Sequence, residues 1–202
     1  MGVNPPAKLP LPPADLPSRE LPLTRITGPL YRVHRASLSA LFFGKSGSSR
    51  FDDPLKQFGV LYAALKPEAA LAEALLRQLR QMLILESALA ERALSVINLT
   101  PVVCVNLTAH GLRRLSCDSR IADEVPYRMP GLWSRAFFEH PQKPAGILYR
   151  SRHNPQLTCV ALFSRSEQRL KLEKTTGLLD AGLRAWTGKQ LTRYRVLLLP
   201  KI

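Results

Sequence analysis

Residues 47–76 read GSSRFDDPLKQFGVLYAALKPEAALAEALL, and this stretch decides how the chain is expected to fold. It opens in a loop of small polar residues, continues through a short apolar strand and ends in a helix rich in alanine and leucine. The three segments carry Arg50, Tyr62 and Glu73, which stand eleven or twelve residues apart. These residues are either ordinary surface and core positions or three walls of one pocket.

The sequence on both sides of this stretch predicts an α+β fold, because several short strands are interspersed with few helices. Helices are expected over residues 67–85, with Pro67 in the first turn, and over residues 131–140. The first helix carries a stripe of core residues at helical spacing, namely Leu71, Leu75, Leu79 and Met82. Strands are expected over residues 30–34, 60–65, 93–100, 102–107, 146–150, 158–163 and 194–199, the last of them closing the sheet.

The N-terminal residues 1–24 differ in composition from the rest of the chain. They contain seven prolines, which forbid regular helix and favour extended backbone: Pro5, Pro6, Pro10, Pro12, Pro13, Pro17 and Pro22. We expect an arm that is flexible or lies along the surface, followed by one folded domain over residues 25–202.

Composition and cysteine content narrow the class of protein. The chain has 202 residues, of which 46% are hydrophobic and 22% charged, as in a globular domain. No apolar run is long enough to cross a bilayer, and the proline-rich start does not resemble a secretory signal. Cys104, Cys117 and Cys159 are widely spaced, which predicts reduced thiols in the cytoplasm and no metal site.

The net charge of +14 and the pI of about 10.4 favour an anionic partner. Nucleic acid, an anionic small molecule and an acidic protein all remain open on charge alone. No helix-turn-helix, zinc-finger or RNA-binding pattern is present, which makes nucleic acid the less favoured partner. Neither GxGxxG nor GxxxxGK[ST] occurs, so a nucleotide would have to bind by another route.

Each residue of interest also has a simple structural explanation. Glu73 stands four residues before Arg77, the favoured order for an ion pair along a helix. Tyr62 suits a core position with its hydroxyl at the edge, and Arg50 suits a solvated loop. Arg32 is less easily explained, because an arginine within an apolar strand needs an anionic partner if its face is buried.

The ordered series LYRVHR, GSSRF, VLYAAL, PEAALAEALL, GILYRSRHN and ALF resembles the RES domain family over roughly residues 30–165. The family is named for its Arg, Glu and Ser residues, and its members include NAD-consuming toxins of bacterial toxin–antitoxin pairs. The resemblance implies a fold like that of ADP-ribosyltransferases, with short-stranded sheets around an NAD cleft. It also implies that NAD is the substrate and that no cofactor is required.

Carried over by position, the family pattern implies two catalytic residues, Glu73 and Arg50, and three substrate-binding residues, Arg32, Tyr62 and Ser151. Arg152 and Asn154 are further candidates. The loop GSSRFDDP departs from the pattern, because Asp52 and Asp53 follow the Arg-Phe pair. Two carboxylates there would weaken the attraction for a dinucleotide unless they point outwards.

The resemblance implies cleavage of NAD by phosphorolysis or hydrolysis, as the toxin of a toxin–antitoxin pair. The antitoxin would be a separate protein that covers the cleft. One alternative is transfer of ADP-ribose to a protein, and another is a non-catalytic basic module that binds nucleic acid.

Overall fold

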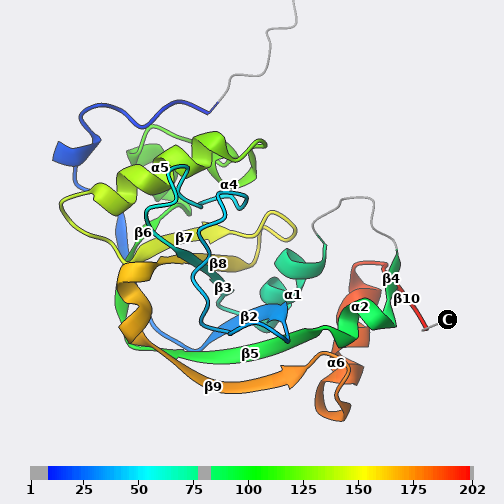
Figure 1. The fold of residues 1–202 in the computed structure, drawn as a ribbon. Helices are drawn as coiled ribbons and strands as arrows, with labels where there is room; N and C mark the ends of the chain where they lie inside the picture. Colours follow the sequence, from blue (N-terminus) through cyan, green and yellow to red (C-terminus); the bar gives the residue numbers. More distant parts are fainter. Residues whose placement is uncertain (1–8, 77–82, 201–202) are drawn as a thin grey trace, which may run out of the picture.

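An eight-stranded sheet forms the body of the molecule in the computed structural model, which describes residues 9–76 and 83–200 (Figure 1). Neighbouring strands are antiparallel except for the parallel pair β6 and β7. The order across the sheet is β1 (Leu23–Ile26), β6 (Val102–Asn106), β7 (Gly146–Arg150), β8 (Thr158–Phe163), β3 (Val60–Ala64), β2 (Leu30–Arg35), β5 (Arg92–Leu99) and β9 (Leu170–Gly177). The α+β prediction is confirmed.

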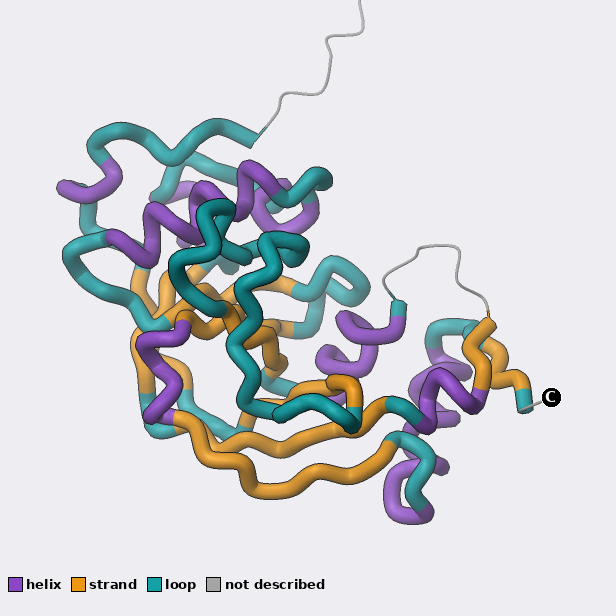
Figure 2. Tube along the Cα trace, viewed as in Figure 1, coloured by secondary structure: helices purple, strands orange, loops and turns teal. Residues whose placement is uncertain are grey.

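The helices lie around this curled sheet. They are α1 (Pro67–Leu75), α2 (Glu86–Ala90), α3 (His110–Arg114), α4 (Arg120–Asp123), α5 (Arg128–Glu139) and α6 (Ala181–Arg193), with short 3₁₀ helices at Leu16–Ser18 and Ser164–Arg169. Helix α1 packs against β2 and β3, and α5 packs against β7 (Figure 1). The long connection between β2 and β3 crosses in front of the sheet as loop structure in the view of Figure 2. Among the described residues, no helix has the length and apolar character to span a membrane.

The central strands β3 and β8 are buried on both faces of the sheet. Because side chains alternate along a strand, Val60 and Ala64 enter one core cluster while Leu61 and Ala63 enter another. The five residues of β3 are consequently almost all apolar, which is the pattern of a strand covered on both sides. This explains why VLYAAL can be recognised as a strand without polar alternation.

Helix α1 begins at Pro67, as predicted, and buries its leucine stripe at Leu71 and Leu75. Three alanines, at positions 69, 70 and 72, are also buried, and these small side chains bring the helix close to the sheet. The predicted extension of the helix to Leu85 is wrong, because the helix ends at Leu75 and a short strand, β4 (Leu83–Leu85), follows. The predicted contributions of Leu79, Met82 and Arg77 lie outside the described residues.

The described part of the N-terminal arm lies along the body of the protein. Trp133 Nε1 on α5 donates a hydrogen bond of 2.8 Å to the Pro10 carbonyl. Three leucines of the arm are at most 2% exposed: Leu9, Leu16 and Leu21. Strand β1 then begins at Leu23 and pairs with β6, so packed structure starts ahead of residue 25. The division into an arm and a domain stays a prediction.

The C-terminal region differs most from expectation. Strand β9 and helix α6 occupy residues for which the sequence predicts no element, and β9 closes the sheet at its β5 edge. The predicted strand over residues 194–199 is shortened to β10 (Leu197–Leu199). That strand pairs with β4 in a separate two-stranded sheet, so the prediction that it closes the main sheet is wrong.

The packing of the arm leads to a first prediction. Leu16→Ala should lower the free energy of unfolding by about 2–5 kcal/mol, because it leaves a cavity beside α5. Leu11→Ala in the same arm should change it by less than about 0.5 kcal/mol, because Leu11 is 63% exposed. Urea denaturation of both variants measures the difference, and equal small losses would show that the arm does not contribute to the core.

His34 on β2 is held as a neutral imidazole by two hydrogen bonds. Its Nδ1 lies 2.8 Å from the Arg35 carbonyl, which only accepts, so Nδ1 carries the hydrogen. In the neutral ring Nε2 then accepts from the Ser95 hydroxyl, also at 2.8 Å. Burial of the ring, together with the positive charge of Arg32, lowers the pKa of His34.

The lowered pKa of His34 predicts a loss of stability in acid. Below about pH 6.5 the histidine of the unfolded chain gains a proton that the folded protein resists, so the stabilisation present above that pH is lost as the pH falls. His34→Gln should reduce the drop in unfolding free energy between about pH 7.5 and pH 5.5. The exposed His110→Gln is the matched control, and an equal drop in wild type and His34→Gln would contradict the prediction.

Candidate functional site

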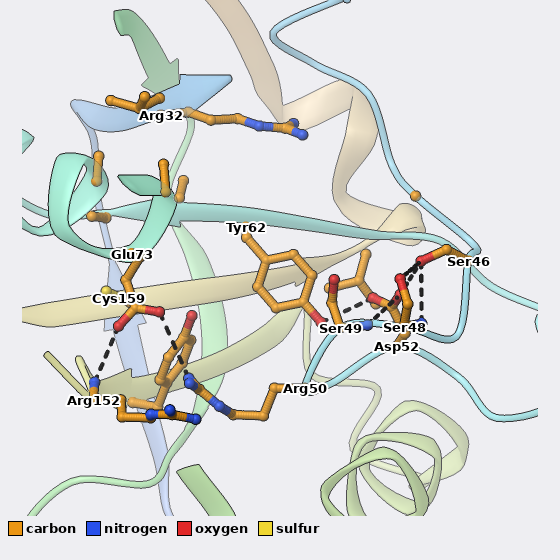
Figure 3. Close-up of a pocket in the computed structure, with 18 of the residues that line it drawn as sticks. Arg32, Ser46, Ser48, Ser49, Arg50, Asp52, Tyr62, Glu73, Arg152 and Cys159 are labelled. Carbon is orange, nitrogen blue, oxygen red and sulfur yellow. Dashed lines mark hydrogen bonds and ion pairs between the residues drawn. The ribbon is translucent and has the colours of Figure 1, made fainter. Parts of the chain in front are cut away.

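A cavity of about 380 Å³ opens between strands β2 and β3, helix α1, the loop between β2 and β3, and the loop between β7 and β8. Figure 3 shows the side chains that face it. Its polar and aromatic lining comes from Tyr31, Arg32, Phe42, Lys45, Ser46, Ser48, Ser49, Arg50, Asp52, Tyr62, Glu73, Tyr127, Tyr149, Arg152 and His153. The volume is typical of a site for a small organic ligand.

Glu73 is held from outside its own helix, by the loop between β7 and β8. Its Oε1 accepts hydrogen bonds from Ser151 Oγ at 2.7 Å and from the backbone N–H of Arg152 at 3.1 Å. Ser151 Oγ in turn accepts from the backbone N–H groups of His153 and Asn154, at 3.2 and 3.3 Å. The carboxylate is thereby fixed in one orientation on the wall of the cavity.

Arg50 is a buried guanidinium that faces Glu73. It is 7% exposed, and its Nη1 lies 3.9 Å from Glu73 Oε2 (Figure 3). The guanidinium carbon stands 5.4 Å from the centre of the Tyr149 ring. Burial disfavours the charged form, but attraction to Tyr149 and Glu73 outweighs it and raises the pKa of Arg50. The side chain therefore stays positively charged.

One buried nitrogen of Arg50 is without a hydrogen-bond partner among the described residues. This nitrogen is Nε. A buried donor without an acceptor costs about 1–3 kcal/mol of stability. Arg50 is thus incompletely hydrogen-bonded by the described protein groups.

Asp52 organises the loop that carries Arg50. Its Oδ1 accepts from the Tyr62 hydroxyl at 2.9 Å, and its Oδ2 accepts from Ser46 Oγ at 2.8 Å and from the Ser49 N–H at 3.1 Å. The Tyr62 hydroxyl accepts from the N–H of Phe51 at 2.8 Å. Burial and the neighbouring Asp52 charge raise the pKa of Tyr62, so the phenol stays protonated and keeps donating to Asp52.

Asp53 stabilises the same loop from outside the cavity. It is 1% exposed, does not line the cavity, and accepts hydrogen bonds from the N–H groups of Leu55 and Gln57. Arg135 on α5 pairs with its carboxylate at 3.2 Å. The charge of Asp53 is therefore compensated away from the cavity, whereas Asp52 points inward and is occupied by hydrogen-bond donors.

Arg32 lies apart from the group formed by Arg50, Glu73 and Arg152 (Figure 3). Its Nη1 donates to the carbonyl oxygens of Ala40 and Phe42, both at 2.9 Å. Burial lowers the pKa of Arg32 to about 10. No carboxylate of the described residues forms an ion pair with Arg32, so the anionic partner expected from the sequence is absent among them.

The structure thus brings Arg32, Arg50, Tyr62 and Glu73 to the walls of one cavity, together with Arg152. Ser151 is 1% exposed and lies behind Glu73, and Asn154 contacts Ser151 through its backbone; neither lines the cavity. The functional roles of these residues stay predictions. Within the described chain, no three His, Cys, Asp or Glu side chains are grouped to hold a metal ion.

Sequence reasoning misses several cavity residues, chiefly Lys45, Phe42, Tyr127, Tyr149 and His153. Tyr149 carries the clearest signal, because it stands two positions before Ser151 in the same short segment. Tyr127 carries none, because the residues around it are mixed and polar without a clear period. Phe42 lies in a short apolar turn whose sequence indicates no role.

These features define the class of the protein: an α+β domain with a ligand-sized cavity in which a fixed glutamate faces a buried arginine. The sequence profile of the RES domain matches residues 22–183, and the chain belongs to the RES domain family. The family resemblance drawn from the sequence is thereby confirmed.

Two individual proteins are similar to this chain. The "Probable toxin y4kH" of Sinorhizobium fredii is 32% identical over 80 residues, which are 40% of this chain and 62% of that protein. A chain in the crystal structure of the M. tuberculosis MbcT–MbcA toxin–antitoxin complex matches with a TM-score of 0.63 at 17% identity. That match covers 84% of this chain and 92% of the other, and it shows that the fold is shared.

The role of Asp52 can be tested by stability. Asp52→Ala should lower the free energy of unfolding by about 1–3 kcal/mol, because the Tyr62 and Ser46 hydroxyls lose their acceptor. Asp52→Asn keeps one acceptor oxygen and should lose less. Asp118→Ala, which removes an exposed ion pair with Arg120, should change stability by less than about 1 kcal/mol. Equal losses in all three variants would show that Asp52 does not organise the loop.

Proposed function

We propose that this protein is an NAD-degrading enzyme that cleaves the bond between nicotinamide and ribose and acts as the toxin of a toxin–antitoxin pair. The observation that carries the proposal is the Glu73 carboxylate, held by Ser151 and the Arg152 N–H and facing buried Arg50 across a cavity. Membership in the RES domain family supports it.

The chemistry requires a negative charge beside the ribose. When the C–N bond breaks, its electron pair leaves with nicotinamide, and the ribose carbon becomes an oxocarbenium-like cation. A carboxylate already oriented in the cavity stabilises that charge without rearranging. In this proposal Glu73 is the catalytic residue that does so, and it also orients the oxygen that attacks the ribose carbon.

Arg50 is suited to hold the anionic part of the dinucleotide. A guanidinium binds phosphate oxygens through forked, charge-assisted hydrogen bonds, and Arg50 lines the cavity. The flat ring of Tyr62, fixed through its hydroxyl by Asp52, is the proposed surface for the nicotinamide ring. No cofactor is needed, because NAD is itself the substrate.

We propose that Ser151 positions Glu73. The family resemblance instead implies a direct contact between Ser151 and the substrate. Its hydroxyl hydrogen is donated to Glu73 Oε1, and its oxygen accepts from two backbone N–H groups. These contacts use the hydrogen-bonding capacity of a hydroxyl group. Ser151 therefore acts on the reaction through the orientation of Glu73.

The acceptor is the group that attacks the ribose carbon and receives the ADP-ribose. We favour an anion or water in this role. Lys45, Arg50 and Arg152 line the cavity, and this positive charge favours inorganic phosphate over water. Attack by phosphate yields nicotinamide and ADP-ribose phosphate, whereas attack by water yields nicotinamide, ADP-ribose and a proton. Transfer to a protein remains the alternative that the experiment below distinguishes.

The proposed partner is a separate antitoxin protein that covers the cavity. A toxin role is supported by the similarity to the S. fredii probable toxin and by the fold shared with a chain of the M. tuberculosis toxin–antitoxin complex. With a net charge of +14, this chain would attract an acidic surface or segment of such a partner.

Nicotinamide release from NAD by the purified protein tests the proposed function. Glu73→Gln should reduce the rate about a hundredfold or more, because it removes the negative charge while preserving shape. Glu68→Gln on the same helix does not alter the cavity lining and should retain the wild-type rate. If wild type releases no nicotinamide when free of any bound inhibitor, the proposal is wrong.

The same assay with and without inorganic phosphate identifies the acceptor. Release that rises in proportion to phosphate, with ADP-ribose phosphate as product, indicates phosphorolysis. Release that is independent of phosphate indicates hydrolysis. Label that moves from NAD to a protein indicates ADP-ribose transfer.

A further inference from the structure

We propose that the end of the cavity formed by Arg32 and Phe42 binds the adenylate half of the dinucleotide, with Phe42 as the surface on which the adenine base stacks. This inference rests on the proposed function, since it assigns a second subsite to the same cavity. It gives a role to an aromatic residue that the family resemblance does not include.

Phe42 is unusual for its exposure. Its side chain lines the cavity, yet it is 54% exposed, and it is the only aromatic residue among the strongly exposed large apolar side chains of the described chain. An exposed phenyl ring costs free energy in water, and a flat base that covers it recovers that cost. Stacking of a base on an aromatic side chain is a recurrent way in which proteins hold nucleotides.

The position of Phe42 is fixed by the backbone around it. Arg32 Nη1 on β2 binds the carbonyl oxygens of Ala40 and Phe42, both at 2.9 Å. The N–H of Phe42 donates to the Ser39 carbonyl at 3.3 Å, which closes a turn. The turn is therefore attached to the sheet, which holds the Phe42 backbone beside the cavity.

Arg32 also supplies the charge that a nucleotide needs. Its Nε and Nη2 have no hydrogen-bond partner among the described residues, and no described carboxylate compensates its charge. A guanidinium in that state is a ready site for a phosphate oxygen. An aromatic ring next to an uncompensated guanidinium matches the base and phosphate of a nucleoside monophosphate.

The cavity is lined by two arginines that lie apart from each other, Arg32 and Arg50. Figure 3 shows Arg32 apart from the group formed by Glu73, Arg50 and Arg152. A ligand with two nucleotide halves would use both arginines, whereas a mononucleotide would use one.

Binding of AMP, measured by calorimetry, tests the Phe42 subsite separately from the reaction. Phe42→Ala should weaken AMP binding at least about tenfold, because stacking on the ring is lost. Phe42→Trp should retain the affinity, and AMP should quench the fluorescence of the new indole. Leu38→Ala is the matched control, because Leu38 is 50% exposed in the same segment but does not line the cavity.

Nicotinamide mononucleotide, which lacks the adenylate half, provides the second arm. Its affinity should be the same in wild type and Phe42→Ala. Equal AMP affinity in wild type and Phe42→Ala, or no AMP binding by a wild type that releases nicotinamide from NAD, would overturn the subsite and leave the proposed function intact. A wild type that neither binds AMP nor releases nicotinamide would overturn both.

Discussion

The burial of a single positive charge constrains the rest of this site. Arg50 is only 7% exposed, and a guanidinium in that position requires compensation from its surroundings. Glu73 gives the opposite charge and Tyr149 gives an aromatic face, but the ion pair is long, at 3.9 Å, and Nε stays without a partner among the described residues. The charge of Arg50 is therefore only partly compensated by the protein, which leaves an attraction for an anionic ligand.

Holding such an incomplete pair in place requires supports on both sides. Ser151 and the Arg152 N–H hold Glu73, and Asp52 holds the loop of Arg50 through Tyr62 and Ser46. Each support comes from a different part of the chain, so the positions of both charged groups depend on the tertiary structure. The spacing of 3.9 Å between Arg50 Nη1 and Glu73 Oε2 is therefore a property of the fold.

The close approach of α1 to the sheet makes this arrangement possible. Buried alanines at positions 69, 70 and 72 leave little between helix and strand, and Glu73 follows directly on the same helix. Larger residues at those positions would push the helix, and with it the carboxylate, away from the loop between β7 and β8. The packing of α1 against the sheet therefore also determines where the Glu73 carboxylate lies.

Strands with strong local signals are predictable, and elements that depend on partners are not. The apolar runs of β3, β7 and β8 are buried on one or both faces, and their hydrophobicity alone indicates strands. Strand β9 is an edge strand, mostly exposed and rich in lysine, so its pairing with β5 leaves no apolar pattern to read. Helix α6 contains Gly182 and Gly188, which lower helix propensity, so the sequence does not predict this helix.

The residues of the site divide in the same way. The sequence by itself determined the α+β class, and its resemblance to the RES domain family implied Arg32, Arg50, Tyr62, Glu73 and Ser151 as site residues, whose roles stay predictions. Only the tertiary structure decided that Ser151 supports Glu73 from behind, that Asp52 organises the loop, and that Phe42 faces the cavity. These contacts join residues that are 10 to 78 positions apart or depend on exposure, and neither long-range contact nor exposure is encoded in local spacing.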